Sequence, residues 1–246
     1  MARFEKGLVR RYVVFFIGLF VLSLGIAAIT KASLGTSPIT SIPYSLSMIF
    51  TSLTLGNFTI LYSFLLVFIQ FLLLGKKANK FNLLEQVIVS VFFGYFVDIG
   101  MFILNDLAPE EYVSRLVCVV LGCCALAFGV YIQIVANLVI IPGDGLAYTL
   151  TMKVRKPYNR VRVTQDMSMV VIAAVIGLVG LGTLGGVREG TIISAILVGN
   201  IANLFLKHLD PVTDFLMPGR SATIHMARDK GKGNDVTEDV EGKASS

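Results

Sequence analysis

Charged residues are scarce in this chain of 246 residues, since lysine, arginine, aspartate and glutamate together make up only 15% of it. Soluble domains carry about 25%, whereas here 55% of the residues are hydrophobic and the mean hydropathy is +0.78. This composition excludes an ordinary soluble domain and predicts an all-α polytopic membrane protein in contact with the lipid bilayer. The net charge of +5 does not indicate nucleic-acid binding, because most basic residues lie in short loops beside apolar runs, where they set orientation.

Cysteine and histidine are also few, and the common catalytic motifs are missing. Cys118, Cys123 and Cys124 lie in one apolar run, and an odd, clustered set does not predict a disulfide framework. We interpret them as small packing residues. Both histidines lie outside the apolar runs, and neither Gly-x-x-x-x-Gly-Lys nor His-Glu-x-x-His occurs. We therefore expect no metal, no cofactor and no enzymatic activity.

Six apolar runs are long enough to cross a bilayer: residues 12–30, 58–74, 84–104, 116–136, 167–182 and 189–206. The first resembles a signal peptide, but it exceeds the about 7–15 residues of such an apolar region, and we interpret it as a retained span. The predicted organisation is a basic cytoplasmic lead at 1–11, membrane repeat 1 at 12–104, an external loop at 105–115, membrane repeat 2 at 116–206, and a polar cytoplasmic tail at 207–246 that is largely disordered.

The two membrane repeats match each other at a constant offset of 104 residues. This offset pairs Gly18 with Gly122, Gly25 with Gly129, Pro38 with Pro142, Tyr44 with Tyr148 and Glu85 with Glu189. Three spans per repeat is an odd number, so the second repeat must insert upside down. With the N-terminus in the cytoplasm, 18 of the 21 lysines and arginines fall on the cytoplasmic side. The sequence therefore predicts six transmembrane helices as two inverted three-helix repeats, with both termini cytoplasmic.

Each repeat carries, after its first span, a proline and a segment too short to cross the membrane. The segment from Pro38 to Phe50 would be a helix of about 20 Å, against roughly 30 Å of hydrocarbon. We interpret this segment and the one from Pro142 as re-entrant half-helices; the alternative is a pair of surface helices in the interface. Under inverted symmetry their N-terminal ends meet, each with free amides and a partial positive charge.

Interrupted helices at corresponding positions of inverted halves frame the substrate site of many transporters. The candidate substrate-binding residues are accordingly those at the starts of the two segments: Ser37, Pro38, Thr40, Tyr44, Pro142, Gly143, Asp144, Gly145 and Tyr148. Ionisable residues inside spans are costly and often functional. The candidates for ion coupling are Asp98, Asp144, Glu85, Glu189 and Asn203, the last being the repeat partner of Asp98 after a one-residue slip.

Several of these candidates have a purely structural alternative. Asp98 lies about 20 Å along its span, where it is either a proton-coupling carboxylate or an aspartate near the outer end of its helix that touches water. Glu85 and Glu189 open the third and sixth spans, and negative charge at a helix N-terminus is stabilising without further function. Arg188 beside Glu189 is either an outer-face charge pair or half of an anion site.

Two motifs carry a resemblance to a known family. They are Ala32-Ser33-Leu34-Gly35-Thr36-Ser37-Pro38 after the first span, and Gly185-Gly186-Val187-Arg188-Glu189-Gly190-Thr191 at the start of the sixth. Over roughly residues 10–207 the chain resembles the YczE/YyaS/YitT family of bacterial integral membrane proteins. The resemblance implies the repeat architecture and a plasma (inner) membrane location, and it implies no substrate. In the second repeat Val139 replaces Gly35, so the two copies are not expected to do identical work.

Two functions remain open at the level of the sequence. The first is a secondary transporter of a small polar solute, coupled to protons or sodium. The second is a non-transporting membrane protein that regulates or assembles with a membrane partner through the basic loop at 153–162 and the tail. The sequence also leaves open a homo-oligomer.

Overall fold

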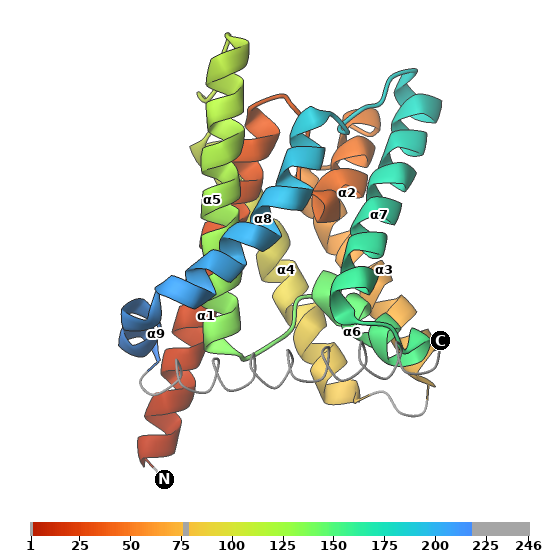
Figure 1. Ribbon diagram of the computed structural model, residues 1–246. Coiled ribbons are helices and arrows are strands. Elements are labelled where there is room, and N and C mark those ends of the chain that lie inside the picture. Colours follow the sequence, from red (N-terminus) through yellow and green to blue (C-terminus); the bar gives the residue numbers. More distant parts are fainter. Residues whose placement is uncertain (1, 76–78, 218–246) are drawn as a thin grey trace, which may run out of the picture.

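The computed structural model describes residues 2–75 and 79–217, with side chains from Gly7 onward, and this part of the chain contains nine helices and no strand (Figure 1). The helices are α1 (Ala2–Lys31), α2 (Pro38–Ile49), α3 (Leu55–Leu74), α4 (Lys80–Ile103), α5 (Tyr112–Ala136), α6 (Pro142–Val154), α7 (Tyr158–Leu181), α8 (Glu189–His208) and α9 (Asp210–Leu216). Six of them, α1, α3, α4, α5, α7 and α8, are long and apolar enough to cross a membrane. The predicted all-α class and the six spans are confirmed.

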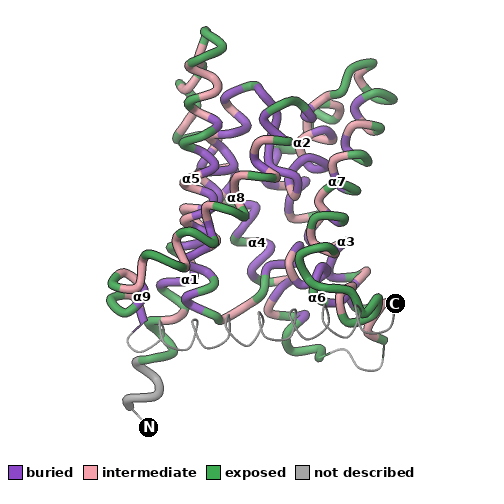
Figure 2. Tube along the Cα trace, viewed as in Figure 1, coloured by how far each residue is buried: buried purple, intermediate pink, exposed green. Residues whose placement is uncertain are grey.

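α1 and α5 pack antiparallel along one side of the bundle, at the left in Figure 1. Near the start of α1, Arg11 donates hydrogen bonds to the carbonyls of Ala136 and Asn137 at the end of α5, at 3.1 and 2.7 Å. Glycines let the two backbones approach closely, as is common between membrane helices. Buried residues gather in the interior around α1 and α2, whereas α7 is largely exposed along its outer side (Figure 2).

The other helix contacts occur largely in pairs in which one contact is the repeat counterpart of the other. α1 packs on α4, and α5 packs on α8; α2 packs on α7, and α6 packs on α3. The pairing fails at one place, because α3 packs along α4 whereas α8 leans away from α7 toward α5 (Figure 1). We call the end of the bundle where α1 begins the N-side and the opposite end the far side.

α2 and α6 are the two short helices predicted from the prolines. They have 12 and 13 residues, and each has its proline in the first turn, where the missing amide hydrogen costs nothing. In Figure 1 α2 lies toward the far side and α6 toward the N-side. α7 begins at Tyr158, nine residues before the predicted start of its span. The difference arises because its first turns are polar, with Arg160, Arg162 and Asp166. A hydropathy pattern does not include such residues in an apolar span.

The last described helix, α9, falls in the segment predicted as a polar tail. It is attached to α5 through the buried Tyr131, whose hydroxyl lies 2.7 Å from Thr213 Oγ1 and donates to the carbonyl of Leu209 at 3.0 Å. The segment 207–246 was predicted as largely disordered, and helix α9 within it was not predicted. The rest of that tail, 218–246, lies outside the described residues, as do Lys76 and Lys77, which follow the predicted span 58–74.

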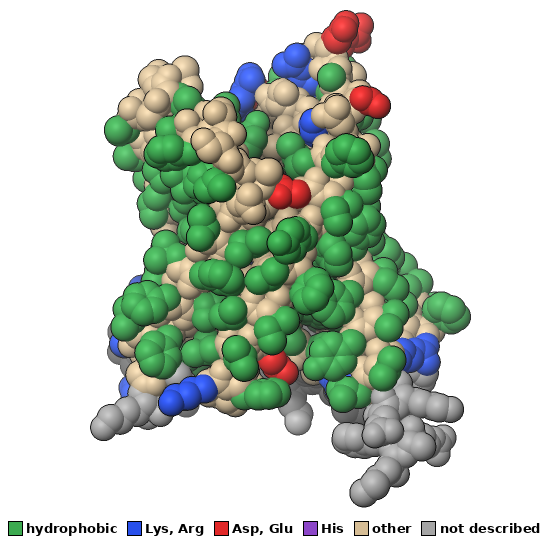
Figure 3. All heavy atoms as spheres, turned by 180° about the vertical axis from the view of Figure 1, so that it is seen from behind, with side chains coloured by type: hydrophobic (Ala, Val, Ile, Leu, Met, Phe, Trp, Pro, Cys, Tyr) green, Lys and Arg blue, Asp and Glu red, His purple; other side chains and the backbone are tan. Residues whose placement is uncertain are grey.

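The outer surface has the character of a bilayer-facing surface. Large apolar side chains such as Phe68, Phe102 and Val179 are exposed. Figure 3 shows hydrophobic side chains over the middle of the molecule, with most of the charged ones near its two ends. This distribution fits a protein whose middle is surrounded by hydrocarbon.

Candidate functional site between the two short helices

The start of α2 is held by a chain of buried hydroxyl groups. Thr36 Oγ1 lies 2.8 Å from Thr30 Oγ1 and 2.9 Å from Thr40 Oγ1, and Ser37 Oγ lies 2.7 Å from Thr40 Oγ1. Thr191 of α8 accepts from the Thr36 amide at 3.2 Å. The predicted site residues Ser37 and Thr40 are therefore buried and already paired, and they fix where α2 begins.

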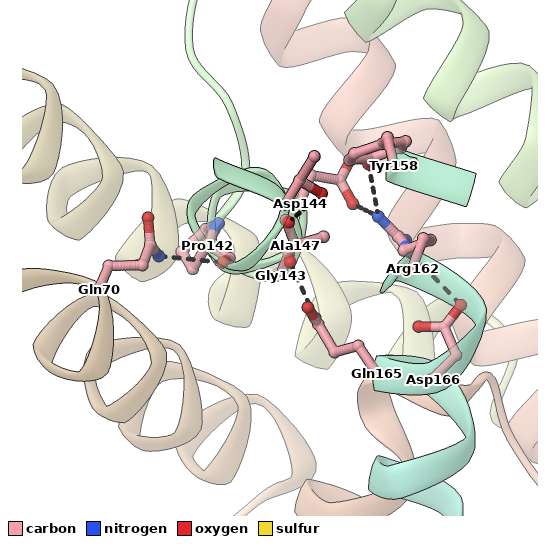
Figure 4. Close-up of polar contacts among 10 residues, drawn as sticks. Gln70, Pro142, Gly143, Asp144, Ala147, Tyr158, Arg162, Gln165 and Asp166 are labelled. Atoms are coloured by element: carbon pink, nitrogen blue, oxygen red, sulfur yellow. Dashed lines mark hydrogen bonds and ion pairs between the residues drawn. The ribbon is translucent and has the colours of Figure 1, made fainter. Parts of the chain in front are cut away.

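The start of α6 is held by two glutamine side chains, one from α3 and one from α7 (Figure 4). Gln70 of α3 donates to the Pro142 carbonyl at 3.1 Å and to Gln86 Oε1 of α4 at 3.1 Å. Gln165 of α7 donates to the Gly143 carbonyl at 3.0 Å. All three glutamines are buried. They were not among the predicted site residues, although a glutamine inside an apolar span is itself a signal, because burying an unpaired amide is costly.

The N-terminal ends of α2 and α6 meet, as the sequence led us to expect. Gly143 lies against the side chain of Ile39, and a Cβ on Gly143 would collide with Ile39. Gly145 also needs its missing side chain, since a Cβ there would lie 2.6 Å from Gln70 Oε1. Ile39 and Gly143 are partners at the offset of 104 residues, so corresponding positions of the two repeats touch.

A cavity of about 920 Å³ lies beside this contact, between α2, α3, α6 and α7. Ile42 and Leu46 of α2 line it together with their repeat partners Leu146 and Leu150 of α6. The lining is mainly apolar, and apart from Tyr62 of α3 its polar members lie on α7 and in the connection that precedes it: Lys156, Arg160, Thr164, Gln165 and Ser168. Both short helices thus contribute equivalent residues to the wall of one cavity.

One arginine joins two carboxylates beside the start of α6 (Figure 4). Arg162 forms an ion pair with Asp144, and its Nε lies 3.3 Å from Asp166 Oδ2. Its Nη1 also donates to the Tyr158 hydroxyl at 3.3 Å. Asp144 stands in the first turn of α6, where the helix dipole favours negative charge. With two carboxylates around one guanidinium, the cluster carries one excess negative charge when all three groups are ionised.

The other predicted coupling residues are not brought together. Asp98 accepts from the Gly56 amide at 2.7 Å and from Thr54 Oγ1 at 2.6 Å, so it holds the start of α3. Glu85 lies near the N-side start of α4, whereas Glu189 lies at the far-side start of α8, exposed and 3.5 Å from Arg188. Asn203 is exposed on α8.

The predicted substrate-binding residues lie behind the cavity rather than in its lining. Pro142, Gly143, Asp144 and Gly145 form the first turn of α6, and Ser37, Pro38 and Thr40 lie at the start of α2. Tyr44 packs against the Gly186 backbone, where a Cβ would collide with its ring, and Tyr148 is exposed. Apart from Tyr148, these residues lie at the starts of the two short helices or anchor them, and the helices in turn supply the cavity wall.

Comparison with known proteins settles the family. Residues 9–207 match a family described as a family of unknown function (DUF6198). The chain belongs to this family. The DUF6198 match runs from α1 to the last turn of α8, so it includes both short helices and the cavity but not α9.

Two proteins of Bacillus subtilis (strain 168) are similar to this DUF6198 chain over nearly their full length. The uncharacterized membrane protein YczE is 29% identical over 221 residues, which are 89% of this chain and 96% of YczE. The uncharacterized protein YyaS is 25% identical over 197 residues, 80% of this chain and 92% of YyaS. The YczE/YyaS part of the resemblance is thereby confirmed. No solved structure matches the chain.

Proposed function

We propose that this membrane protein is a secondary transporter built as an inverted repeat, with its solute bound in the cavity between α2 and α6. The observation that carries the proposal is the arrangement of the short helices. Their N-terminal ends meet at Ile39 and Gly143, and repeat partners from both line one cavity. Interrupted helices that meet between inverted halves are the usual frame of a transporter site.

The contact between α1 and α5 supports the inverted repeat. Gly25 packs on Leu126, and Gly129 packs on Leu22. At the offset of 104 residues Gly25 corresponds to Gly129 and Leu22 to Leu126. The two contacts are therefore the same contact made twice with the repeats exchanged. A two-fold axis between the repeats produces this reciprocity.

We assign the coupling step to the cluster of Asp144, Arg162 and Asp166. Its excess carboxylate suits a proton or a sodium ion, and Asp144 belongs to one of the helices that line the cavity. Both carboxylate oxygens of Asp98 are engaged at the start of α3, which leaves it a structural role. Coupling to a gradient requires that ion binding favours one state of the cavity over the other.

The test uses cysteines at the repeat partners Leu46 and Leu150, which line the cavity toward the far side and the N-side. Leu46→Cys and Leu150→Cys are each made in a chain whose three native cysteines are replaced by alanine. Each variant protein is then reconstituted in liposomes. A membrane-impermeant thiol reagent then measures reactivity under opposite proton or sodium gradients. Ser52→Cys, exposed in the connection between α2 and α3 and outside the cavity lining, is the control.

A transporter predicts that reversing the gradient raises the reaction rate at one of the two cavity cysteines and lowers it at the other, while the control stays constant. Rates that do not respond to either gradient, or that rise and fall together, would contradict the proposal. That result would favour the non-transporting alternative.

A further inference from the structure

The walls of the cavity point to a solute with an apolar body. Its lining comes mainly from leucine, isoleucine, valine, methionine and phenylalanine, and its volume of about 920 Å³ lies near the upper end of the roughly 300–1,000 Å³ range of ligand pockets. Over most of this surface a small polar solute would lose its hydration without gaining hydrogen bonds, because the few polar side chains of the lining lie mainly on and before α7. The lining thus favours a solute class different from the one predicted from the sequence.

The cavity opens sideways, at the depth of the hydrocarbon. Leu61 and Leu65 of α3 and Ile172 of α7 belong to its walls and are 54%, 51% and 49% exposed. All three lie well inside helices long enough to span the membrane. A groove at this depth is in contact with acyl chains rather than with water, so a ligand from the bilayer reaches it without crossing an aqueous phase.

The N-side end of the groove is positively charged. Lys156 lies in the connection between α6 and α7, and Arg160 lies in the first turn of α7; both line the cavity and are exposed. Within residues 2–75 and 79–217 neither forms an ion pair, whereas the neighbouring Arg162 is occupied by two carboxylates. Basic residues at the end of a membrane helix, beside a groove between helices, attract anionic headgroups.

One buried acceptor in the lining lacks a partner. Gln165 is 7% exposed, its Nε2 is committed to the Gly143 carbonyl, and its Oε1 has no hydrogen bond from the described residues. An unpaired buried amide oxygen is costly, and a ligand hydroxyl in the cavity would satisfy it. The ligand therefore combines an apolar chain, an anionic group and a hydrogen-bond donor.

We propose that the groove binds an anionic phospholipid of the N-side leaflet, with its acyl chain between α3 and α7 and its phosphate at Lys156 and Arg160. The inference rests on the transporter proposal in that it names the solute class of the same cavity. Charge complementarity at one end and an apolar opening along the rest select this ligand over a neutral lipid.

The binding experiment measures which lipids stay on the protein. The protein is placed in nanodiscs of equal phosphatidylglycerol and phosphatidylcholine and released for native mass spectrometry. Phosphatidylglycerol supplies the acyl chains, the anionic phosphate and free hydroxyls. We expect it to be retained in preference to phosphatidylcholine. Lys156→Gln/Arg160→Gln should reduce the preference by about tenfold, since each exposed cation contributes modestly.

Two further variants separate the groove from general effects. Lys80→Gln/Lys207→Gln removes the same charge from exposed residues that do not line the cavity and should leave the preference unchanged. Leu150→Trp fills the cavity and should lower retention of both lipids while the unfolding temperature stays near that of the wild type. If Leu150→Trp does not fold, Leu65→Trp in the α3 wall takes its place.

Equal retention of the two lipids, or a preference that the double glutamine variant does not change, would overturn the proposal. So would a dimer without bound lipid that dissociates in Leu150→Trp, because the groove would then be an interface between two copies. A second readout, transfer of tail-labelled phosphatidylglycerol between leaflets of proteoliposomes, tests the transporter itself. Selective binding without gradient-dependent transfer supports the lipid site and counts against the transporter. Gradient-dependent cysteine reactivity without lipid selectivity supports the transporter and counts against the lipid site.

Discussion

Alanine at Gly25 or Gly129 should force α1 and α5 apart. A Cβ on Gly25 would lie 2.7 Å from Leu126 Cα, and a Cβ on Gly129 would lie 2.6 Å from Leu22 Cα. Both obstacles are backbone atoms, so no side-chain rotation relieves the overlap. Ordinary van der Waals contact begins at 3.4 Å, which requires the two helices to separate by roughly 0.8 Å at this point.

A separation of this size weakens much of the interface. A gap of about 0.5–1 Å forfeits a quarter to a half of each dispersion contact, and packing is the main force between membrane helices. Overpacking of this kind costs about 1–3 kcal/mol, against which alanine recovers about 1 kcal/mol of helix propensity. We expect the two single variants to be destabilised equally, and the double variant by less than the sum, because one separation accommodates both methyl groups.

The assay is unfolding in mixed micelles with increasing denaturing detergent, with Gly199→Ala as the control. Gly199 lies in α8, where an added methyl group would meet no atom of the described residues within 4 Å, so this variant gains propensity without a clash. If Gly25→Ala and Gly129→Ala unfold like Gly199→Ala, the close approach of α1 and α5 is refuted. Clearly unequal losses would refute the reciprocal contact.

Three further predictions concern single side chains. Asp98→Asn should lower the free energy of unfolding by about 1–2 kcal/mol, since the charge-assisted bonds that begin α3 weaken, and detergent unfolding measures it. Tyr131→Phe should cost about 1 kcal/mol and speed proteolysis at α9, because Tyr131 ties that helix to α5; unchanged proteolysis would contradict the attachment. Arg162→Gln should destabilise the protein because it leaves Asp144 and Asp166 without their cation, and adding Asp144→Asn should restore part of the loss; no recovery would show that the two do not act together.

The helices could be predicted because their signals are local. Hydropathy marks the spans, and Pro38 and Pro142 mark the starts of α2 and α6, since proline suits the first helical turn. The hydropathy pattern did not predict the polar beginning of α7. The spacing of Arg162 and Asp166, four residues apart on one helix face, was a local signal for it. α9 was not predicted, because its attachment depends on a contact between Thr213 and Tyr131, which lie 82 residues apart in the sequence.

The site was harder to predict because its contacts join distant segments. Asp98 looked like a coupling carboxylate as long as its partners at Thr54 and Gly56 were unknown. The residues that line the cavity are ordinary leucines and isoleucines, which no motif distinguishes from lipid-facing ones. The buried glutamines were detectable in principle, because an amide in an apolar span needs a partner.

The most direct test of the inverted architecture is the sidedness of two repeat partners in intact cells. Ser52 precedes α3 and Lys156 precedes α7, 104 residues apart, and both are exposed. In a chain without native cysteines, a membrane-impermeant maleimide should label Ser52→Cys from outside, and it should label Lys156→Cys only after the membrane is opened. Labelling of both residues from the same side would contradict the inverted repeat and, with it, the account of the cavity.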